Sequence, residues 1–425
     1  MLMRKLPYFG WEVNCACNHN CIFCYNYNQD QLRPDCTTEQ ELAAVSDFLV
    51  EQSPVSVTIS GGEALLLFQE LKPHILKLRD HGILVRILSN GALIDQSMAQ
   101  FFAQQDIHLL ISFPSVDRDI FGQVTGQPDS YDQVIAGMDL LKANGVIFQP
   151  NVVVTTVNLA TLRETADFLW KRYAPPSVMV SRATKPTNAG PEFARLLLSN
   201  QQLEQMFDTC VSLSKEHDIR FNTCGGFALC AMNSPESYEI FGKVCGGGLH
   251  DCVVTGNGDI RVCSRDDRVY GNIFREPFHE IRERMTGWRE AQIPETCKGC
   301  NKARSCRGGC HMSSTEPDRN PGSLDCHAVP DRVPVPYVRR WPKVKVGLLR
   351  RYRVMPFREV PEAGEVRLSV GINYGYFSQK LVNWLCGRKA VTLLGVMSRE
   401  HHGKKAMEEL LRIGILAPLE KLKGQ

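Results

Sequence analysis

The chain has 425 residues, more than one hydrophobic core usually organises, so two or three domains are expected. Hydrophobic residues make up 43% and charged residues 22%, and the formal net charge of +3 gives no reason to expect nucleic-acid or membrane binding. No apolar run approaches the ~20 residues that span a bilayer. Residues 1–11 lack the features of a signal peptide, so a cytoplasmic location is predicted.

From Trp11 to Ser181, short β-branched runs alternate with amphipathic helical patterns. Strands are predicted at residues 11–15, 55–60, 83–89, 107–113, 148–155 and 178–181. Helices are predicted at residues 38–52, 66–81, 95–104, 131–144, 159–173 and 199–217. Repeated strand–helix units predict a parallel sheet in an α/β fold, and six of them predict a full or partial β/α barrel.

Small and polar residues follow the predicted strands, at the edge where barrel enzymes place their active sites. Glycine and asparagine also form ordinary turns, but six such loops together favour a binding site. The residues concerned are Gly61, Gly62, Glu63, Asn90, Ser112, Asn158, Ser181 and Arg182.

Cysteine is unusually abundant and unevenly distributed. Of 17 cysteines, four lie between Cys15 and Cys24 and ten between Cys224 and Cys326. Disulfides are rarely structural in a reducing compartment, so thiols in such number indicate metal ligands. The second group of cysteines lies in glycine-rich sequence with little hydrophobic periodicity. We expect this segment to lack a core of its own and to rely on metal clusters for stability.

The first group, Cys17, Cys21 and Cys24, places three thiolates in one loop. A cubane iron–sulfur cluster held by three thiolates keeps one iron open for a small molecule. S-adenosylmethionine (SAM) offers an amino group and a carboxylate that can chelate such an iron. Structural zinc normally takes four ligands, and His19 or Cys15 could complete that alternative.

This loop resembles the hallmark motif of the radical SAM superfamily, in which an aromatic residue precedes the last cysteine. The resemblance implies that Phe23 packs near the adenine and that the Gly61-Gly62-Glu63 turn binds the SAM amino group. Ser112 matches a position often near the ribose. We assign Asn90, Asn158, Ser181 and Arg182 to the same cofactor site. Ala64 departs from the proline found in many relatives.

The second group is similar to the SPASM extension of radical SAM enzymes that mature peptides. That resemblance implies two auxiliary [4Fe-4S] clusters beside the SAM cluster. It assigns to the outer one Cys297, Cys300, Cys306 and Cys326, and to the inner one Cys245, Cys263 and Cys310. The fourth inner ligand stays open among Cys230, Cys252 and, less favoured, Cys224. A zinc knuckle is the alternative for Cys297–Cys310.

Residues 344–419 resemble the small leader-peptide recognition domains, of winged-helix-like α+β fold. Strands are predicted at residues 344–355 and 365–370, and helices at 378–386, 391–399 and 404–413. Strand addition would bind an extended leader. The nearby basic residues could attract an acidic leader, bind DNA, or form a solvated face: Arg339, Arg340, Lys343, Lys345, Arg350, Arg351 and Arg353.

Four segments are therefore predicted: a radical SAM barrel at 1–222, a SPASM domain at 223–328, a basic proline-rich linker at 329–343 and a recognition domain at 344–425. The resemblance implies a peptide maturase that forms a crosslink in a ribosomally made precursor. Its electron donor would be a low-potential protein such as flavodoxin or ferredoxin. The alternatives are a sulfatase-maturase-like formylglycine former, disfavoured by Ser264, and a non-catalytic iron–sulfur protein. No catalytic base is assigned.

Overall fold

The computed structural model describes residues 5–26, 37–186, 189–243, 245–290, 293–314, 323–330, 351–354, 358–362, 365–370, 373–386, 388, 390–392, 396, 403–412 and 415–418. Cys36 and the greater part of the basic linker lie outside these ranges.

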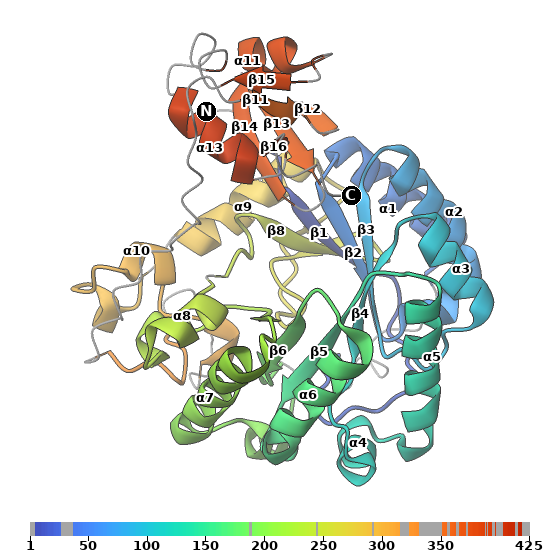
Figure 1. The fold of residues 1–425 in the computed structure, drawn as a ribbon, viewed down its shortest axis with the longest axis vertical. Coiled ribbons are helices and arrows are strands. Elements are labelled where there is room, and N and C mark those ends of the chain that lie inside the picture. Colours follow the sequence, from blue (N-terminus) through green and yellow to red (C-terminus); the bar gives the residue numbers. More distant parts are fainter. Residues whose placement is uncertain are drawn as a thin grey trace.

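Six parallel strands form the centre of the molecule, in the same order as in the sequence (Figure 1). The strands are β1 (Tyr8–Glu12), β2 (Ser56–Ser60), β3 (Leu84–Ser89), β4 (His108–Ser112), β5 (Phe148–Val154) and β6 (Val178–Arg182). A short strand, β7 (Phe221–Asn222), pairs with β6. This arrangement confirms the predicted α/β fold with a parallel sheet.

Helices cover the outer side of these strands (Figure 1). They are α1 (Glu39–Gln52), α2 (Phe68–Asp80), α3 (Gln96–Gln104), α4 (Arg118–Thr125), α5 (Tyr131–Ala143), α6 (Leu162–Tyr173) and α7 (Asn200–His217). Strand β3 shows the resulting alternation, because Val85 and Ile87 are buried while Arg86 and Leu88 are only partly so. The α4 helix is absent from the sequence-based prediction.

The first helix begins where the sequence places a capping box. The Thr38 side chain accepts the Glu41 backbone N–H at 3.2 Å, and the Glu41 carboxylate accepts the Thr38 N–H at 2.8 Å. Two N–H groups that a helix start cannot pair internally are thereby satisfied. This local chemistry explains why the start of α1 agrees with the prediction to within one residue.

The first strand lies three residues earlier than predicted. It spans Tyr8–Glu12, and Tyr8 pairs with Ser56 of β2. Beyond Glu12 and Val13 the chain leaves the sheet, because the Asn14 carbonyl oxygen and side chain both accept the Gly62 N–H, at 2.9 and 3.1 Å. Cys15 consequently lies beyond the strand, in the loop that carries the first cysteine group.

The cysteine-rich segment does not stand apart from the barrel. Strand β8 (Asp251–Thr255) runs parallel to β1, and β9 (Asp259–Arg261) and β10 (Gly271–Asn272) extend the same sheet to ten strands. Its apolar residues Phe227, Phe241 and Ile260 join the barrel's hydrophobic core. The segment therefore shares the core of the barrel and has no separate core among the described residues, while the contribution of metal clusters to its stability stays a prediction. Its helices are α8 (Pro235–Phe241), α9 (Phe278–Glu290) and α10 (Ala303–Cys306).

The described residues of the C-terminal part include two three-stranded antiparallel sheets and the helices α11 (Gln379–Leu385) and α13 (Gly403–Arg412). One sheet has the order β15 (Ala390–Thr392), β11 (Arg351–Val354), β16 (Leu416–Pro418), and the other the order β12 (Arg358–Glu362), β13 (Glu365–Val370), β14 (Asn373–Ser378). Helices α11 and α13 contribute Leu381, Met407 and Leu410 to a separate small core. The helix predicted at 391–399 is wrong at its start, where β15 pairs with β11.

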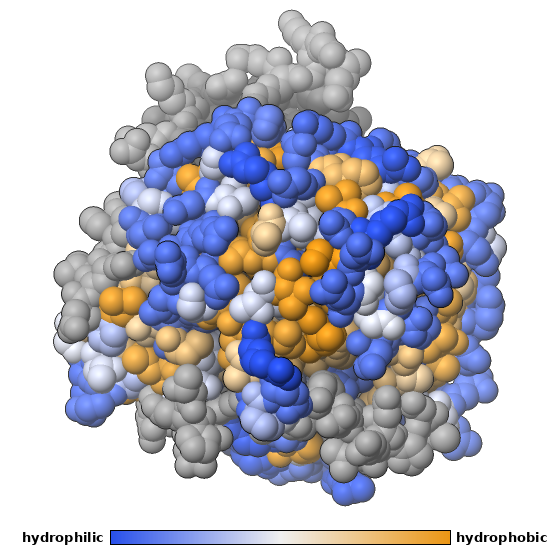
Figure 2. All heavy atoms as spheres, turned by 90° about the horizontal axis from the view of Figure 1, so that it is seen from below, coloured by the Kyte–Doolittle hydropathy of each residue, from blue (hydrophilic) through white to orange (hydrophobic). Residues whose placement is uncertain are grey.

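Figure 2 shows apolar side chains gathered near the centre of the face seen from below, with hydrophilic residues around them. The large apolar side chains that are exposed range from Phe274 at 44% to Ile147 at 48%. Among the described helices, none combines the length and the apolar character needed to cross a bilayer.

One buried ion pair joins the first barrel strand to the cysteine-rich segment. Arg261 of β9 pairs with Glu12 of β1, and the two side chains are 1% and 7% exposed. The Arg261 guanidinium also donates to the Asp266 carbonyl oxygen at 3.3 Å. Because both charges are removed from water, each charge offsets part of the desolvation cost of the other.

Replacing Glu12 with glutamine should therefore lower the free energy of unfolding by about 3–5 kcal/mol, since it strands a buried guanidinium. Denaturant unfolding measures this loss. The matched control is Glu216→Gln, which breaks the exposed Arg163–Glu216 pair, whose side chains are 43% and 46% exposed. That change should cost about 0–1 kcal/mol. Equal losses in the two variants would contradict the role given to Glu12.

Candidate cofactor and cluster sites

The first cysteine loop follows β1 and brings Cys17, Cys21 and Cys24 together. Burial raises the pKa of the Cys21 thiol well above its ordinary value, and the neighbouring thiols of Cys24 and Cys17 raise it further. A group of thiols that repel each other's charge when ionised is stabilised by a cation that accepts all of them. The three thiols could thus hold an iron cluster.

The loop is anchored to the end of α4. The N–H groups of Asn20 and Ile22 donate to the carbonyl oxygens of Thr125 and Val124, at 2.9 and 3.0 Å. Gly126, with φ of +66°, lies so close that an added Cβ would be 2.8 Å from the Asn20 oxygen. The α4 helix, which the sequence did not reveal, therefore helps to fix the shape of the cysteine loop.

The Gly61-Gly62-Glu63 turn packs directly against the same loop. A Cβ added to Gly62 would lie 2.1 Å from the Ala16 carbonyl oxygen, closer than real contacts permit. The N–H of Glu63 donates to that same oxygen at 2.7 Å. Glycine at position 62 is therefore required by the close approach of two backbones.

Glu63 is buried and connects this turn to the end of β3. Its two carboxylate oxygens accept the N–H groups of Leu65 and Asn90, at 3.0 and 2.8 Å. Burial raises the pKa of Glu63 in spite of these hydrogen bonds. The Asn90 side chain in turn donates to the Asn18 side chain at 2.6 Å. Glu63 is therefore linked to Asn90, and Asn90 is linked to Asn18 in the cysteine loop.

The other residues assigned to SAM have different contacts; Phe23 lies in the cysteine loop, and the rest lie at or just beyond strand ends. Asn158 is fully buried, and its amide donates to the Pro114 carbonyl oxygen at 2.9 Å while its oxygen accepts the Thr155 N–H at 2.8 Å. The Ser181 hydroxyl accepts the Cys224 N–H at 3.3 Å. Phe23 and Ser112 are half-buried.

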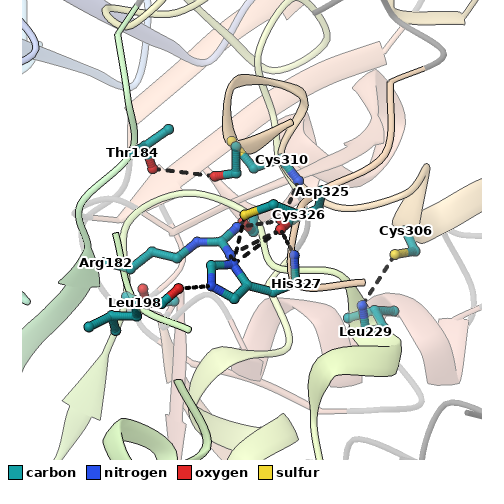
Figure 3. Close-up of polar contacts among 12 residues, drawn as sticks. Arg182, Thr184, Leu198, Leu229, Cys306, Cys310, Asp325, Cys326 and His327 are labelled. Carbon is teal, nitrogen blue, oxygen red and sulfur yellow. Dashed lines mark hydrogen bonds and ion pairs between the residues drawn. The ribbon is translucent and has the colours of Figure 1, made fainter. Parts of the chain in front are cut away.

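Arg182 points into the second cysteine group (Figure 3). Its guanidinium forms an ion pair with Asp325, contacts Nδ1 of His327 and lies 4.5 Å from the Phe227 ring. Burial raises the pKa of Asp325, but Arg182 outweighs that effect and the net pKa is lowered. The ion pair fixes the chain beside a cysteine, because Asp325 also accepts the Cys310 N–H at 3.0 Å.

The inner cysteine set lies near this pair. Burial raises the pKa of Cys263 to about 12, with Arg265 opposing and the thiols of Cys245 and Cys310 adding to the rise. Cys245 is also close to the turn after Cys224, since a Cβ added to Gly226 would lie 3.3 Å from the Cys245 Cβ. Cys245, Cys263 and Cys310 are therefore brought together, with Cys224 beside them.

One further thiol, that of Cys230, lies within electrostatic range of the outer set. Burial raises the pKa of Cys297, and the thiols of Cys306 and Cys300 contribute. Burial likewise raises the pKa of Cys230, and here the thiols of Cys297 and Cys300 contribute. The structure thus places Cys230, expected near the inner set, beside Cys297 and Cys300.

Cys252 lies elsewhere. It is 1% exposed within β8, where it pairs in register with Phe9 of β1 and belongs to the hydrophobic core. Sequence reasoning missed Asn18, Arg265, Asp325 and His327, which surround the thiols. Asp325 and His327 flank Cys326 in the sequence, a spacing that could have drawn attention to them.

The spacing of the thiols bears on which metal they could hold. Four sulfurs bound to one zinc lie about 3.8 Å apart, given a Zn–S distance of ~2.3 Å and tetrahedral geometry. In the described part of the chain, the one group of three or more potential ligand atoms within 4.8 Å of one another is Asp325, Cys326 and His327. Arg182 already pairs with that group. None of the three cysteine sets forms so tight a group among the residues that the structure describes.

Two family models match the chain in the expected places. The radical SAM superfamily model covers residues 11–169, from β1 to α6. The model of the SPASM iron–sulfur cluster-binding domain covers residues 245–301. The first contains the three loop cysteines and the Gly-Gly-Glu turn, and the second contains Cys245, Cys263, Cys297 and Cys300.

Characterised proteins resemble the chain over most of their length. The AdoMet-dependent heme synthase of Methanosarcina barkeri is 24% identical over 70% of this chain and 89% of its own. The mycofactocin maturase MftC of Mycobacterium tuberculosis is 26% identical over 71% and 77%. SuiB of Streptococcus suis with bound S-adenosylmethionine shares the fold, with a TM-score of 0.59 and 18% identity over 76% and 77%. AdoMet-bound anSMEcpe is similar, with a TM-score of 0.59 and 18% identity over 72% and 89%.

The Gly62→Ala variant tests the packing of the cysteine loop. The added methyl group must displace the Ala16 carbonyl oxygen, so we expect a loss of about 1–3 kcal/mol in stability together with reduced iron in the first cluster. Thermal unfolding and iron analysis measure the two effects. Gly287→Ala is the control, because a Cβ there meets nothing within 4 Å. Normal iron content in the Gly62→Ala variant would refute the argument.

The geometry and the family models point to the same cofactors. Three thiols in one loop beside a glycine turn suit a [4Fe-4S] cluster with an iron open to SAM, and the cysteine-rich segment suits auxiliary clusters. The radical SAM model implies SAM and a [4Fe-4S] cluster, and the SPASM model implies auxiliary iron–sulfur clusters. The chain therefore contains a radical SAM domain, matched over residues 11–169, and a SPASM iron–sulfur cluster-binding domain, matched over residues 245–301.

Proposed function

We propose that this enzyme matures a ribosomally made precursor peptide. The observation that carries the proposal is the joint presence of a SAM-type cysteine loop and a SPASM segment on one ten-stranded sheet. The similarity to mycofactocin maturase MftC supports it. So does the shared fold with SuiB, which has been crystallised with the precursor peptide SuiA.

The residues divide into two roles. Cys17, Cys21 and Cys24 would hold the radical-generating cluster, and the Gly-Gly-Glu turn with Asn90 would shape the SAM site beside it. When bound, such a cluster would supply the electron for reductive cleavage of SAM to methionine and a 5′-deoxyadenosyl radical, and that radical would take hydrogen from the peptide. The protein's part is to position the substrates and keep water away. The auxiliary clusters would carry or accept electrons, with flavodoxin or ferredoxin as donor.

The C-terminal part, residues 344–425, would bind the leader of the precursor. Among the described residues, β12 and β14 each pair only with β13, so each leaves an edge at which a further strand could be added. Pro361 removes one backbone donor from β12, which makes β14 the better edge for strand addition. The rest of the chain would divide into the barrel at residues 1–222, the SPASM domain at 223–328 and the linker at 329–343.

Formylglycine formation is less well supported, although anSMEcpe shares the fold. Ser264 replaces the aspartate that directly follows the cysteine in sulfatase maturases. Asp266, one of two acidic residues close by, is 1% exposed, and both its oxygens accept hydrogen bonds from Arg268, at 2.9–3.1 Å. Asp266 is therefore held in an ion pair and is poorly placed to act as a base.

The first test is whether the reduced, reconstituted enzyme forms 5′-deoxyadenosine from SAM and changes the mass of candidate precursor peptides. We expect both, and the Cys17/Cys21/Cys24→Ala variant should form neither while keeping the iron of the auxiliary clusters. Liquid chromatography with mass spectrometry measures both products. If 5′-deoxyadenosine forms and a porphyrin rather than any peptide is changed, the peptide assignment is wrong.

A further test concerns leader binding by the full-length protein. An acidic leader peptide should bind with a dissociation constant that rises as salt is increased from 50 to about 500 mM, because added ions screen the attraction to the basic segment. Titration calorimetry gives the affinity. Tight, salt-independent binding of double-stranded DNA, with no binding of leader, would contradict this assignment.

A further inference from the structure

Cys230 lies on a short 3-10 turn, Leu229–Ala231, that docks onto the outer cysteine set. The N–H of Leu229 donates to the sulfur of Cys306 at 3.3 Å (Figure 3). The residue next to Cys230 is thus already held against a member of that set. The turn itself is anchored, since Leu229 and Ala231 are buried in the main hydrophobic core.

The Cys230 sulfur has the surroundings of a cluster ligand. It accepts the Val329 N–H at 3.2 Å, and backbone N–H bonds to sulfur are a common feature of thiolates that hold iron–sulfur clusters. Cys297 and Cys300 are close enough to act electrostatically on its thiol. The Cys230 thiol in turn contributes to the raised pKa of Cys306. The Cys230 thiol is therefore within electrostatic range of Cys297, Cys300 and Cys306, and the Leu229–Cys306 hydrogen bond holds its turn against that set.

Cys326, the outer ligand implied by the family resemblance, has different neighbours. Its sulfur lies 3.2 Å from Nδ1 of His327. Figure 3 shows it beside Arg182 and His327, whereas Cys306 lies apart from them with Leu229. The Arg182–Asp325 ion pair, with side chains 4% and 0% exposed, holds the chain on this side. Moving Cys326 to the outer set would disturb a buried ion pair.

We propose that Cys230, and not Cys326, supplies the fourth thiolate of the outer auxiliary cluster. The outer ligand set is then Cys230, Cys297, Cys300 and Cys306. Cys326 stays on the Cys310 side, within the network of Arg182, Asp325 and His327. The proposal requires an outer auxiliary cluster but does not require a peptide substrate. Its test is therefore independent of the test of the peptide assignment.

The test compares single alanine variants of the full-length protein, reconstituted anaerobically. Cys297→Ala defines the spectroscopic change caused by losing an outer ligand, and Cys245→Ala does the same for the inner cluster. Cys252→Ala controls for the loss of a buried cysteine, because Cys252 lies in the core of the sheet. Iron content, Mössbauer spectra and electron paramagnetic resonance of the oxidised samples are the readouts, and circular dichroism reports folding.

The Cys230→Ala variant should reproduce the Cys297→Ala change, with up to about four irons lost or a three-iron cluster formed on oxidation. The Cys326→Ala variant should keep the outer-cluster signal. The inference is overturned if folded Cys230→Ala protein retains wild-type iron and spectra. It is equally overturned if Cys326→Ala, rather than Cys230→Ala, matches Cys297→Ala. Should Cys230→Ala fail to fold, Cys230→Ser provides the second variant, and an altered outer-cluster spectrum without loss of secondary structure is then the expected result.

Discussion

The structure depends on the need to compensate buried thiols that lie close to one another. Each of the three cysteine sets is drawn together by backbone packing, and in each the neighbouring thiols and burial oppose ionisation. A multivalent metal group favours the ionised form in such a setting, because it binds the thiolates and neutralises their charge. The glycine turn, the anchor at α4 and the Arg182–Asp325 pair all serve to hold these thiols in position.

The barrel and the cysteine-rich segment form one structural unit. Strand β8 continues the sheet beside β1, and the Glu12–Arg261 pair joins the two segments in the interior. The cysteine loop follows β1 directly, so the strand that carries the radical-generating site also contacts the cluster-binding segment. A rigid connection of this kind suits electron transfer, which is sensitive to the distance between clusters. It also explains why the boundary drawn at residue 222 from the sequence does not coincide with a break in the sheet.

Much of the barrel could be predicted, because hydrophobic periodicity and local capping decide where its helices lie. The start of α1 follows from the Thr38–Glu41 box, and β2 to β6 lie within one or two residues of their predicted bounds. The β1 shift could not be predicted, since it depends on Asn14 contacting Gly62 across 48 residues. Helix α4 was missed, and β15 was taken for a helix because its strand character comes from pairing with β11. For the sites, cysteine spacing identified the groups, whereas the positions of Cys230 and Arg182 depend on tertiary contacts that spacing does not encode.

The most direct test of this account is the metal content of the anaerobically reconstituted wild-type protein, measured with its Mössbauer spectrum. The account predicts about twelve irons per chain, all in cubane clusters, with little zinc. One zinc per cysteine set with little iron would contradict it, because the thiols would then be structural and the chemistry inferred from them would have no basis.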